Sequence, residues 1–171
     1  MKLAYVSLNG RGATDACLAD AVALMRAAGL ALAGTVQTNP PREGRAVCDM
    51  DLHVLPGGPV LRISQDLGAG ARGCRLDSGA LEEAVARSAR RLVRAEALVV
   101  NKFGKTEAEG RGFVPVIAEA LERGLPVLVG VNALNLEAFL AFAGDLAMAL
   151  PADPARVAAW VLNAARASRA A

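Results

Sequence analysis

Short apolar runs alternate along the chain with longer segments in which apolar residues recur at helical spacing. The short runs predict strands at residues 3–8, 31–37, 97–103, 126–131 and 146–150. The helical periodicity predicts helices at residues 15–28, 78–94, 113–123, 134–143 and 153–169. Strands that alternate with helices favour a three-layer α/β fold, in which helices cover both faces of a mainly parallel sheet.

The middle of the chain departs from this alternation. Two short runs, at residues 50–55 and 60–64, flank a turn of two prolines and two glycines and predict a β-hairpin or two edge strands. A glycine-rich loop is expected at residues 65–73. We therefore expect one α/β domain over residues 1–171, with a small β-hairpin insert at about residues 46–77.

Polar residues mark the starts of two predicted helices. Ser78 stands where a side-chain hydroxyl can cap the helix that follows the insert. Asp153 is the expected N-cap of the last helix, with Pro154 in its first turn. The apolar face of that helix, which includes Val157, Trp160 and Val161, is expected to pack on its own sheet.

Composition fits one folded domain and gives no sign of a nucleic-acid or membrane partner. Hydrophobic residues make up 54% of the 171 residues and charged residues 21%, which excludes a disordered chain. The formal net charge is only +2, so nucleic acid and acidic membranes have no electrostatic support as partners. The apolar runs are shorter than the roughly 20 residues that a membrane span needs. The start of the chain reads as a strand rather than a signal peptide.

The cysteines form no recognisable disulfide or metal pattern. Cys17, Cys48 and Cys74 are odd in number and far apart, which favours reduced thiols and a cytoplasmic location. Cys17 lies in a helical apolar pattern and is expected in the core. No metal site is expected, because no closely spaced pair of cysteines or histidines occurs. A site built from Cys48, Cys74 and His53 stays open beside a plain structural role for these residues.

The loop after the first strand has the features of an anion-binding turn. Its glycines allow a tight bend that brings backbone N–H groups close to an anion, at the partly positive start of a helix. Asp15 occupies the position of the lysine in a Walker A motif, and Ala16 that of the hydroxyl ligand of Mg²⁺. A tight strand–helix turn capped by Thr14 or Asp15 is the alternative. The candidate residues of this loop are Asn9, Gly10, Arg11, Gly12, Ala13, Thr14 and Asp15.

A second candidate loop, residues 101–112, follows the strand predicted at residues 97–103. Its Gly104-Lys105-Thr106 is not a Walker A motif, because the first glycine of that motif would fall on Val99, inside the strand. Loops at the carboxyl ends of parallel strands meet at one edge of the sheet, where ligands bind. This charged loop favours a ligand site, and a solvated loop with offsetting charges is the alternative. The candidates here are Asn101, Lys102, Lys105, Glu107 and Arg111.

Together these segments resemble a bacterial domain family of unknown function that is often encoded near molybdenum-transport genes. That family in turn resembles nucleoside triphosphatases with a P-loop fold, and the resemblance covers most of residues 3–150. It rests on Gly10-Arg11-Gly12, Asp15, Leu18, Gly34-Thr35-Val36-Gln37, Cys48-Asp49-Met50, Ile63-Ser64-Gln65-Asp66-Leu67-Gly68, Gly73-Cys74-Arg75-Leu76-Asp77, Asn101-Lys102-Phe103-Gly104-Lys105, Glu107, Gly110-Arg111-Gly112 and Pro126-Val127-Leu128.

This sequence differs from the nucleoside triphosphatases at the positions whose side chains bind phosphate and Mg²⁺ during phosphoryl transfer. The phosphate-binding lysine is replaced by Asp15, the Mg²⁺-binding hydroxyl by Ala16, and the Walker B acidic pair by Asn101 and Lys102. Phosphoryl transfer depends on Lys and Mg²⁺ to neutralise developing charge, so ordinary hydrolysis is not expected. The exchange of charges predicts an Asp15–Lys102 ion pair across the former phosphate site.

Three functions remain open from the sequence. The first is a non-hydrolysing protein with a degenerate P-loop that binds a small anion, either a nucleotide or an oxyanion such as molybdate, with a link to molybdenum uptake or homeostasis implied by the resemblance. The second is a slow nucleoside triphosphatase in which Glu107 positions water and Lys102 or Lys105 replaces the missing lysine. The third is a regulatory interaction protein with a vestigial site. A protein partner and a homo-oligomer are both open.

Overall fold

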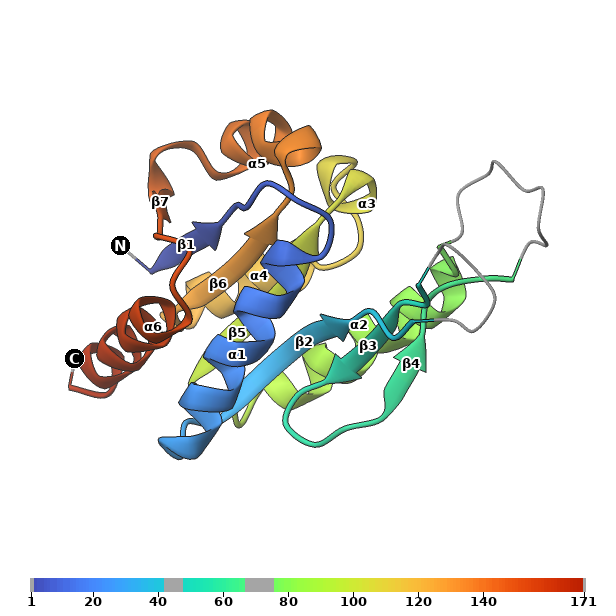
Figure 1. Ribbon diagram of the computed structural model, residues 1–171. Helices are drawn as coiled ribbons and strands as arrows, with labels where there is room; N and C mark the ends of the chain where they lie inside the picture. Colours follow the sequence, from blue (N-terminus) through green and yellow to red (C-terminus); the bar gives the residue numbers. More distant parts are fainter. Residues whose placement is uncertain (1, 42–47, 67–75, 171) are drawn as a thin grey trace.

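One seven-stranded sheet forms the centre of the molecule in the computed structural model, which describes residues 2–41, 48–66 and 76–170 (Figure 1). The strand order is β4-β3-β2-β5-β6-β1-β7. Strands β1, β2, β5, β6 and β7 run parallel, whereas β3 runs antiparallel to β2, and β4 to β3. The strands are β1 (Leu3–Val6), β2 (Leu32–Thr38), β3 (Asp51–Val54), β4 (Val60–Arg62), β5 (Ala97–Phe103), β6 (Val127–Val131) and β7 (Ala147–Ala149).

The predicted fold class is confirmed, including the hairpin insert. Strands β3 and β4 form an antiparallel hairpin on β2, and β4 is the edge strand of the sheet. Leu52 and Val54 of β3 are buried, because successive side chains of a strand point to opposite faces and these two point to the core. The loop expected at residues 65–73, and parts of the insert expected at about residues 46–77, lie largely outside the described residues.

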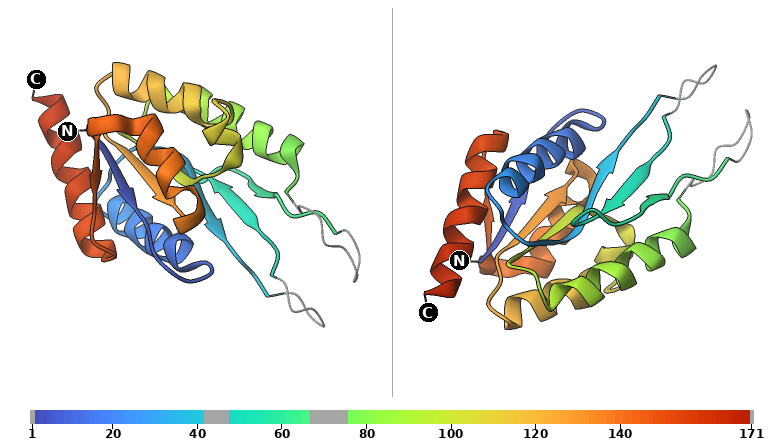
Figure 2. Two further views of the ribbon diagram at one scale, coloured as in Figure 1. Left: turned by 90° about the horizontal axis from the view of Figure 1, so that it is seen from above. Right: turned by 90° about the horizontal axis from the view of Figure 1, so that it is seen from below.

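Helices cover both faces of the sheet (Figure 2). Helices α1 and α6 pack together on one face, and α2, α4 and α5 contribute to the core on the other. No helix within the described ranges is long and apolar enough to cross a membrane. The helices are α1 (Ala13–Ala27), α2 (Ser78–Leu92), α3 (Lys105–Ala108), α4 (Val114–Glu122), α5 (Leu136–Ala143) and α6 (Pro154–Arg169), with 3₁₀ turns η1 (Ala133–Asn135) and η2 (Gly144–Leu146).

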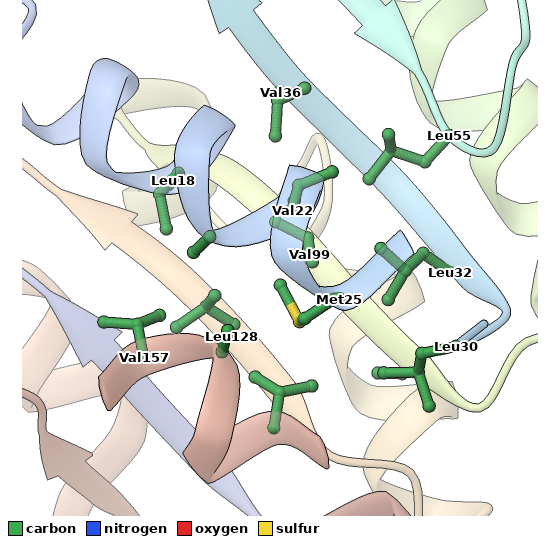
Figure 3. Close-up of a cluster of buried hydrophobic side chains, with 14 of the residues drawn as sticks. Leu18, Val22, Met25, Leu30, Leu32, Val36, Leu55, Val99, Leu128 and Val157 are labelled. Carbon is green, nitrogen blue, oxygen red and sulfur yellow. The ribbon is translucent and has the colours of Figure 1, made fainter. Parts of the chain in front are cut away.

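The core between α1, α6 and the sheet is built almost entirely from aliphatic side chains (Figure 3). Leu18 and Met25 of α1 are fully buried, and Val157 and Val161 of α6 close the same cluster. Burial of each large aliphatic side chain contributes about 1.5–3 kcal/mol. Trp160 is half-buried against this cluster, so the apolar face of the last helix packs on its own domain, as expected.

Helix starts confirm one predicted cap and correct another. The Asp153 carboxylate accepts hydrogen bonds from the N–H groups of Ala155 (2.9 Å) and Arg156 (3.1 Å), as an N-cap does. Helix α2 is capped by Asp77 and not by Ser78, because Ser78 is already its first helical residue. An oxygen of Asp77 accepts from the N–H of Ala80 at 3.0 Å.

Two glycines allow the central strand β5 to fit closely between its neighbours. A Cβ on Gly34 of β2 would lie 1.8 Å from the carbonyl oxygen of Val99, and its φ is +106°. A Cβ on Gly130 of β6 would lie 2.1 Å from the carbonyl oxygen of Asn101. The register of β5 against β6 shifts after Val100, which marks a β-bulge at this point. The bulge lies where β5 reaches the ligand edge of the sheet.

Candidate functional site

The glycine turn, residues 9–15, joins β1 to α1 and leaves the start of that helix without a side-chain cap. Gly12 is the N-cap residue, with a φ of 75°, and has no side chain to accept a hydrogen bond. The predicted cap by Thr14 or Asp15 is therefore wrong. The Thr14 hydroxyl instead accepts from the N–H of Leu8 at 3.1 Å and holds the turn to β1. The Ala13 N–H donates to the Gly10 carbonyl at 3.4 Å and the Ala16 N–H to the Gly12 carbonyl at 3.0 Å. The N–H groups of Thr14 and Asp15, which lack partners among the described residues, are therefore the ones available to a ligand here.

Asp15 is held by three side-chain amides. Its Oδ1 accepts from Asn101 Nδ2 at 2.9 Å, and its Oδ2 accepts from Asn39 Nδ2 at 2.8 Å and Gln37 Nε2 at 3.3 Å. The orientation of Asn101 is fixed, because its Oδ1 accepts from the backbone N–H of Gln37 at 2.8 Å. Gln37 Nε2 also donates to Asn39 Oδ1 at 2.7 Å. The amide network, as we call these four residues, requires a side chain at position 15 that only accepts hydrogen bonds.

The predicted ion pair between Asp15 and Lys102 is not formed. Asp15 satisfies its oxygens with neutral amides, whereas Lys102 is exposed and makes no ion pair within the part of the chain that the structure describes. The two residues nevertheless lie at the same edge of the sheet, since both line the same two cavities. The reason for the separation is local: Asn101, which precedes Lys102 on β5, already occupies the space beside Asp15.

Two adjoining cavities surround the glycine turn. An open groove of about 770 Å³ runs past the start of α1 to the end of β2, and is lined by Arg11, Asp15, Asn39 and Lys102 among others. A smaller cavity of about 180 Å³ lies over the turn itself and is bounded on its far side by Asn132, after β6. The predicted residues Gly10, Arg11, Gly12, Thr14, Asp15, Asn101 and Lys102 all line this smaller cavity.

The second predicted loop contains a short helix, α3, that the sequence analysis did not anticipate. Glu107 in α3 is only 4% exposed, and both of its carboxylate oxygens accept from backbone N–H groups. The donors are Gly104, at 3.0 Å, and Phe113, at 3.2 Å. Gly112 is needed beside it, because a Cβ there would lie 2.2 Å from the Glu107 carboxylate. Glu107 therefore ties together the two ends of its loop.

Three other charged residues of this loop, Lys105, Glu109 and Arg111, form ion pairs with one another. Glu109 forms ion pairs with Arg111 and with Lys105, whose Nζ lies 3.9 Å from a Glu109 oxygen. The hydrogen bond from Arg111 is the main cause that holds the pKa of Glu109 below its ordinary value. Among the predicted residues of this loop, Asn101 and Lys102 therefore lie with the glycine turn, whereas Lys105 and Glu107 line a different cavity.

Asn9 and Ala13 complete the account of the predicted residues. Asn9 is exposed at the start of the turn, and Ala13 is the first residue of α1. Gln37, Asn39 and Asn132 also line these cavities and were not predicted, although each stands at or just after the carboxyl end of a parallel strand. That position was the available signal, because such ends meet at the ligand edge.

Metal-ligating side chains do not gather in this region. No group of three or more His, Cys, Asp or Glu residues that could hold a metal ion occurs among residues 2–41, 48–66 and 76–170. Cys74 lies outside these ranges, so a site with Cys48 and His53 stays untested. The ring Nε2 of His53 hydrogen-bonds the Thr38 hydroxyl at 2.8 Å. Cys17 is buried, as expected, and burial, followed by the charges of two nearby aspartates, raises the pKa of its thiol.

Comparison with known proteins places the fold and the family. The protein is 33% identical over 147 residues to the molybdenum import ATP-binding protein ModC 2 of Bradyrhizobium diazoefficiens, a match that covers 85% of this chain. It spans only 16% of that relative's length.

Two solved structures share its fold. THEP1 of Aquifex aeolicus superposes with a TM-score of 0.62 at 14% identity, over 91% of both chains. A human cancer-related nucleoside triphosphatase superposes with a TM-score of 0.57 at 17% identity, over 99% of this chain and 97% of the other. The predicted resemblance is confirmed by a family model that matches residues 3–160. The chain therefore belongs to DUF2478, a family described as a protein of unknown function.

Proposed function

We propose that this protein binds a small anion at the glycine turn, either the phosphate groups of a nucleotide or a free oxyanion, and does not hydrolyse nucleotides. The observation that carries the proposal is the start of α1, which has no side-chain cap and faces a cavity that Lys102 also lines. Lys102 forms no ion pair with any residue that the structure describes. The fold shared with nucleoside triphosphatases supports the same location for the ligand.

Binding would use the backbone of the turn and two cations. The first N–H groups of α1 and the positive end of its dipole favour an anion. Arg11 and Lys102 line the same cavity, and neither forms an ion pair with another described residue. Their charges are therefore available to a ligand, unlike those of Lys105 and Arg111, which are paired with Glu109.

Hydrolysis lacks the groups that it needs at this site. The residues do not fit Mg²⁺, because Ala16 has no hydroxyl and Asn101 directs its amide nitrogen toward Asp15. Asp15 adds negative charge where phosphoryl transfer needs positive charge. Glu107 is 4% exposed, each of its oxygens accepts from a backbone N–H of its own loop, and it lines a different cavity from the one over the glycine turn.

The identity of the anion is narrowed by one relative. That relative is named as an ATP-binding protein of molybdenum import, and this chain matches 16% of the relative's length. Molybdate, ATP and GTP are therefore the first anions to test, with inorganic phosphate as the simplest probe of the turn. If molybdate is the anion that binds, we propose a role in molybdenum uptake or homeostasis.

Isothermal titration calorimetry with each of these four anions tests the proposal. We expect saturable binding of at least one anion that weakens about tenfold in Arg11→Gln and Lys102→Gln, the loss of one charge contact of about 1.4 kcal/mol. Arg166→Gln, which removes an exposed arginine from α6, is the matched control. Absence of heat with all four anions, from protein that unfolds cooperatively, would end the proposal.

A phosphate-release assay with ATP, GTP and Mg²⁺ tests the non-hydrolysing part separately. We expect no turnover above the buffer rate. Turnover that is lost in Glu107→Gln while folding is retained would instead support a slow nucleoside triphosphatase.

A further inference from the structure

A third cavity, of about 350 Å³, lies on the face of the sheet opposite α1, beside the β3–β4 hairpin. We call it the hairpin cavity. Residues of β2, β3, β5, α2 and α3 line it, together with the segments that follow β4 and β6. Asn101 and Lys102 of β5 also line the cavity over the glycine turn, so the two cavities meet at these residues. The volume is at the small end of the range for ligand pockets, which suits a molecule of one or two rings.

One wall of the hairpin cavity is apolar. Leu52, Ile63 and Phe113 are each no more than 4% exposed, and Leu81 of α2 packs with the first two in one cluster. Water in contact with such a wall forms no hydrogen bonds to it, so the wall favours the apolar part of a ligand over water.

The opposite wall holds an unsatisfied hydroxyl. Thr35 on β2 is 1% exposed, and its Oγ1 is the buried side-chain oxygen or nitrogen that has no hydrogen-bond partner in the described ranges. Valine has the same branched shape and suits a strand equally well. A buried hydroxyl without a partner destabilises the fold. The choice of threonine over valine at position 35 is explained if a ligand in the cavity forms a hydrogen bond with this hydroxyl.

The mouth of the cavity favours negative charge. Lys102, which forms no ion pair with another described residue, lines it beside Lys105, which pairs with Glu109. The one carboxylate among the lining residues, Glu107, accepts from backbone N–H groups. Asn132 and Asn135 add polar groups: Asn132 Oδ1 accepts from the Asn135 backbone N–H at 3.0 Å and from its Nδ2 at 2.9 Å. The amide nitrogen of Asn132 is left for another acceptor.

We propose that the hairpin cavity is a second ligand site, distinct from the glycine turn, and that it takes a small amphipathic organic anion. The apolar body of the ligand packs against Leu52, Ile63 and Phe113, a polar group bonds the Thr35 hydroxyl, and the anionic group lies at Lys102. This site goes beyond the proposed function, because it selects an apolar molecule that carries a charge rather than an inorganic anion.

Titration with 8-anilinonaphthalene-1-sulfonate tests the site, since this probe combines apolar rings with a sulfonate and fluoresces in apolar surroundings. We expect saturation at one probe for each chain, loss of at least tenfold in affinity in Leu81→Trp, which fills the cavity, and no change in Leu140→Trp. Leu140 is 42% exposed on α5 and serves as the matched control. No saturable binding, or equal binding in both variants, would overturn the proposal.

Two further variants complete the test. The first shows whether the probe binds at this site or at the glycine turn, and the second tests the unsatisfied hydroxyl in protein without ligand. Arg11→Gln should leave probe binding unchanged, and a loss of binding there would place the probe at the glycine turn and contradict the proposal. Thr35→Val should raise the Tm of the free protein, because it removes the unpaired hydroxyl. Thr38→Val, on the same strand, breaks the bond to His53 and should not raise it. An unchanged or lower Tm for Thr35→Val would show that the hydroxyl is already satisfied, and the proposal would fall.

Discussion

Replacing Asp15 by asparagine should destabilise the fold while strengthening anion binding. The substitution keeps the shape of the side chain but introduces an N–H donor where amide donors of Gln37, Asn39 and Asn101 converge. Asn101 cannot turn over to compensate, because its oxygen already accepts from the backbone N–H of Gln37 at 2.8 Å. At least one amide of the network must therefore lose its acceptor.

The magnitude follows from the burial of these groups. Asn101 is 2% exposed and Gln37 is 5% exposed, so water does not replace the lost acceptor. A hydrogen bond to a charged group contributes about 1.5–3 kcal/mol, and we expect Asp15→Asn to lower the free energy of unfolding by about 2–3 kcal/mol. For a domain of this size the Tm should fall by about 4–12 °C.

Urea unfolding followed by circular dichroism measures this loss, with Asp20→Asn as the control. Asp20 lies exposed on the same helix, and its substitution should change the free energy of unfolding by less than about 0.5 kcal/mol. Calorimetry with phosphate supplies the second measurement. Removal of a like charge beside the turn should tighten phosphate binding about tenfold, or about 1.4 kcal/mol.

The two effects have opposite signs, which general damage to the fold cannot produce. Equal stability losses in Asp15→Asn and Asp20→Asn would refute the role of the amide network. Weaker phosphate binding in a folded Asp15→Asn protein would refute the placement of the anion at the glycine turn.

Other predictions concern the fold and its response to pH. Gly34→Ala should lower the free energy of unfolding by at least about 3 kcal/mol in a urea titration, because its Cβ meets a carbonyl oxygen, whereas Gly29→Ala, with positive φ but open space, should cost about 1 kcal/mol. Asp77→Ala should cost about 1 kcal/mol and Ser78→Ala much less, by the same assay, because only Asp77 caps α2. The pKa of the Cys17 thiol is raised from its ordinary value of 9.0, so the folded chain keeps a proton that the unfolded chain loses. Unfolding at pH 8, 9 and 10 should therefore show stability falling above about pH 9, by up to about 1.4 kcal/mol per pH unit, with a smaller fall in Cys17→Ala.

Much of the fold could be predicted from the sequence because its elements carry strong local signals. The strand at residues 97–103 has the bounds expected from its apolar run, since β5 is buried on both faces. The hairpin was predicted from two short runs that flank a turn of prolines and glycines. Short α3 was missed because four residues give no periodicity, and its start depends on a contact between Glu107 and the Gly104 backbone.

The candidate site was predicted in location but not in its contacts. The rule that carboxyl ends of parallel strands meet brought Asp15 and Asn101 to one edge correctly. The rule could not assign their hydrogen-bond partners, because it does not give the order of the strands. In this sheet β2 lies next to β5. Gln37 and Asn39 reach Asp15 through that order. Charge alone therefore favoured Lys102 as the partner, although three neutral amides fill that place.

The extra residue in β5 changes which face of the sheet the side chains at the end of this strand point to. Side chains of a regular strand point alternately to the two faces, so Val99 and Asn101 belong to the α1 side and Phe103 would join them. Phe103 instead stacks on Phe139 of α5, with ring centroids 5.2 Å apart, on the other side. The register shift after Val100 reverses the alternation within three residues. One strand thereby supplies Asn101 to the amide network that holds Asp15, and Phe103 to the aromatic cluster on the other face. Shortening β5 by one residue would force a choice between these two contacts.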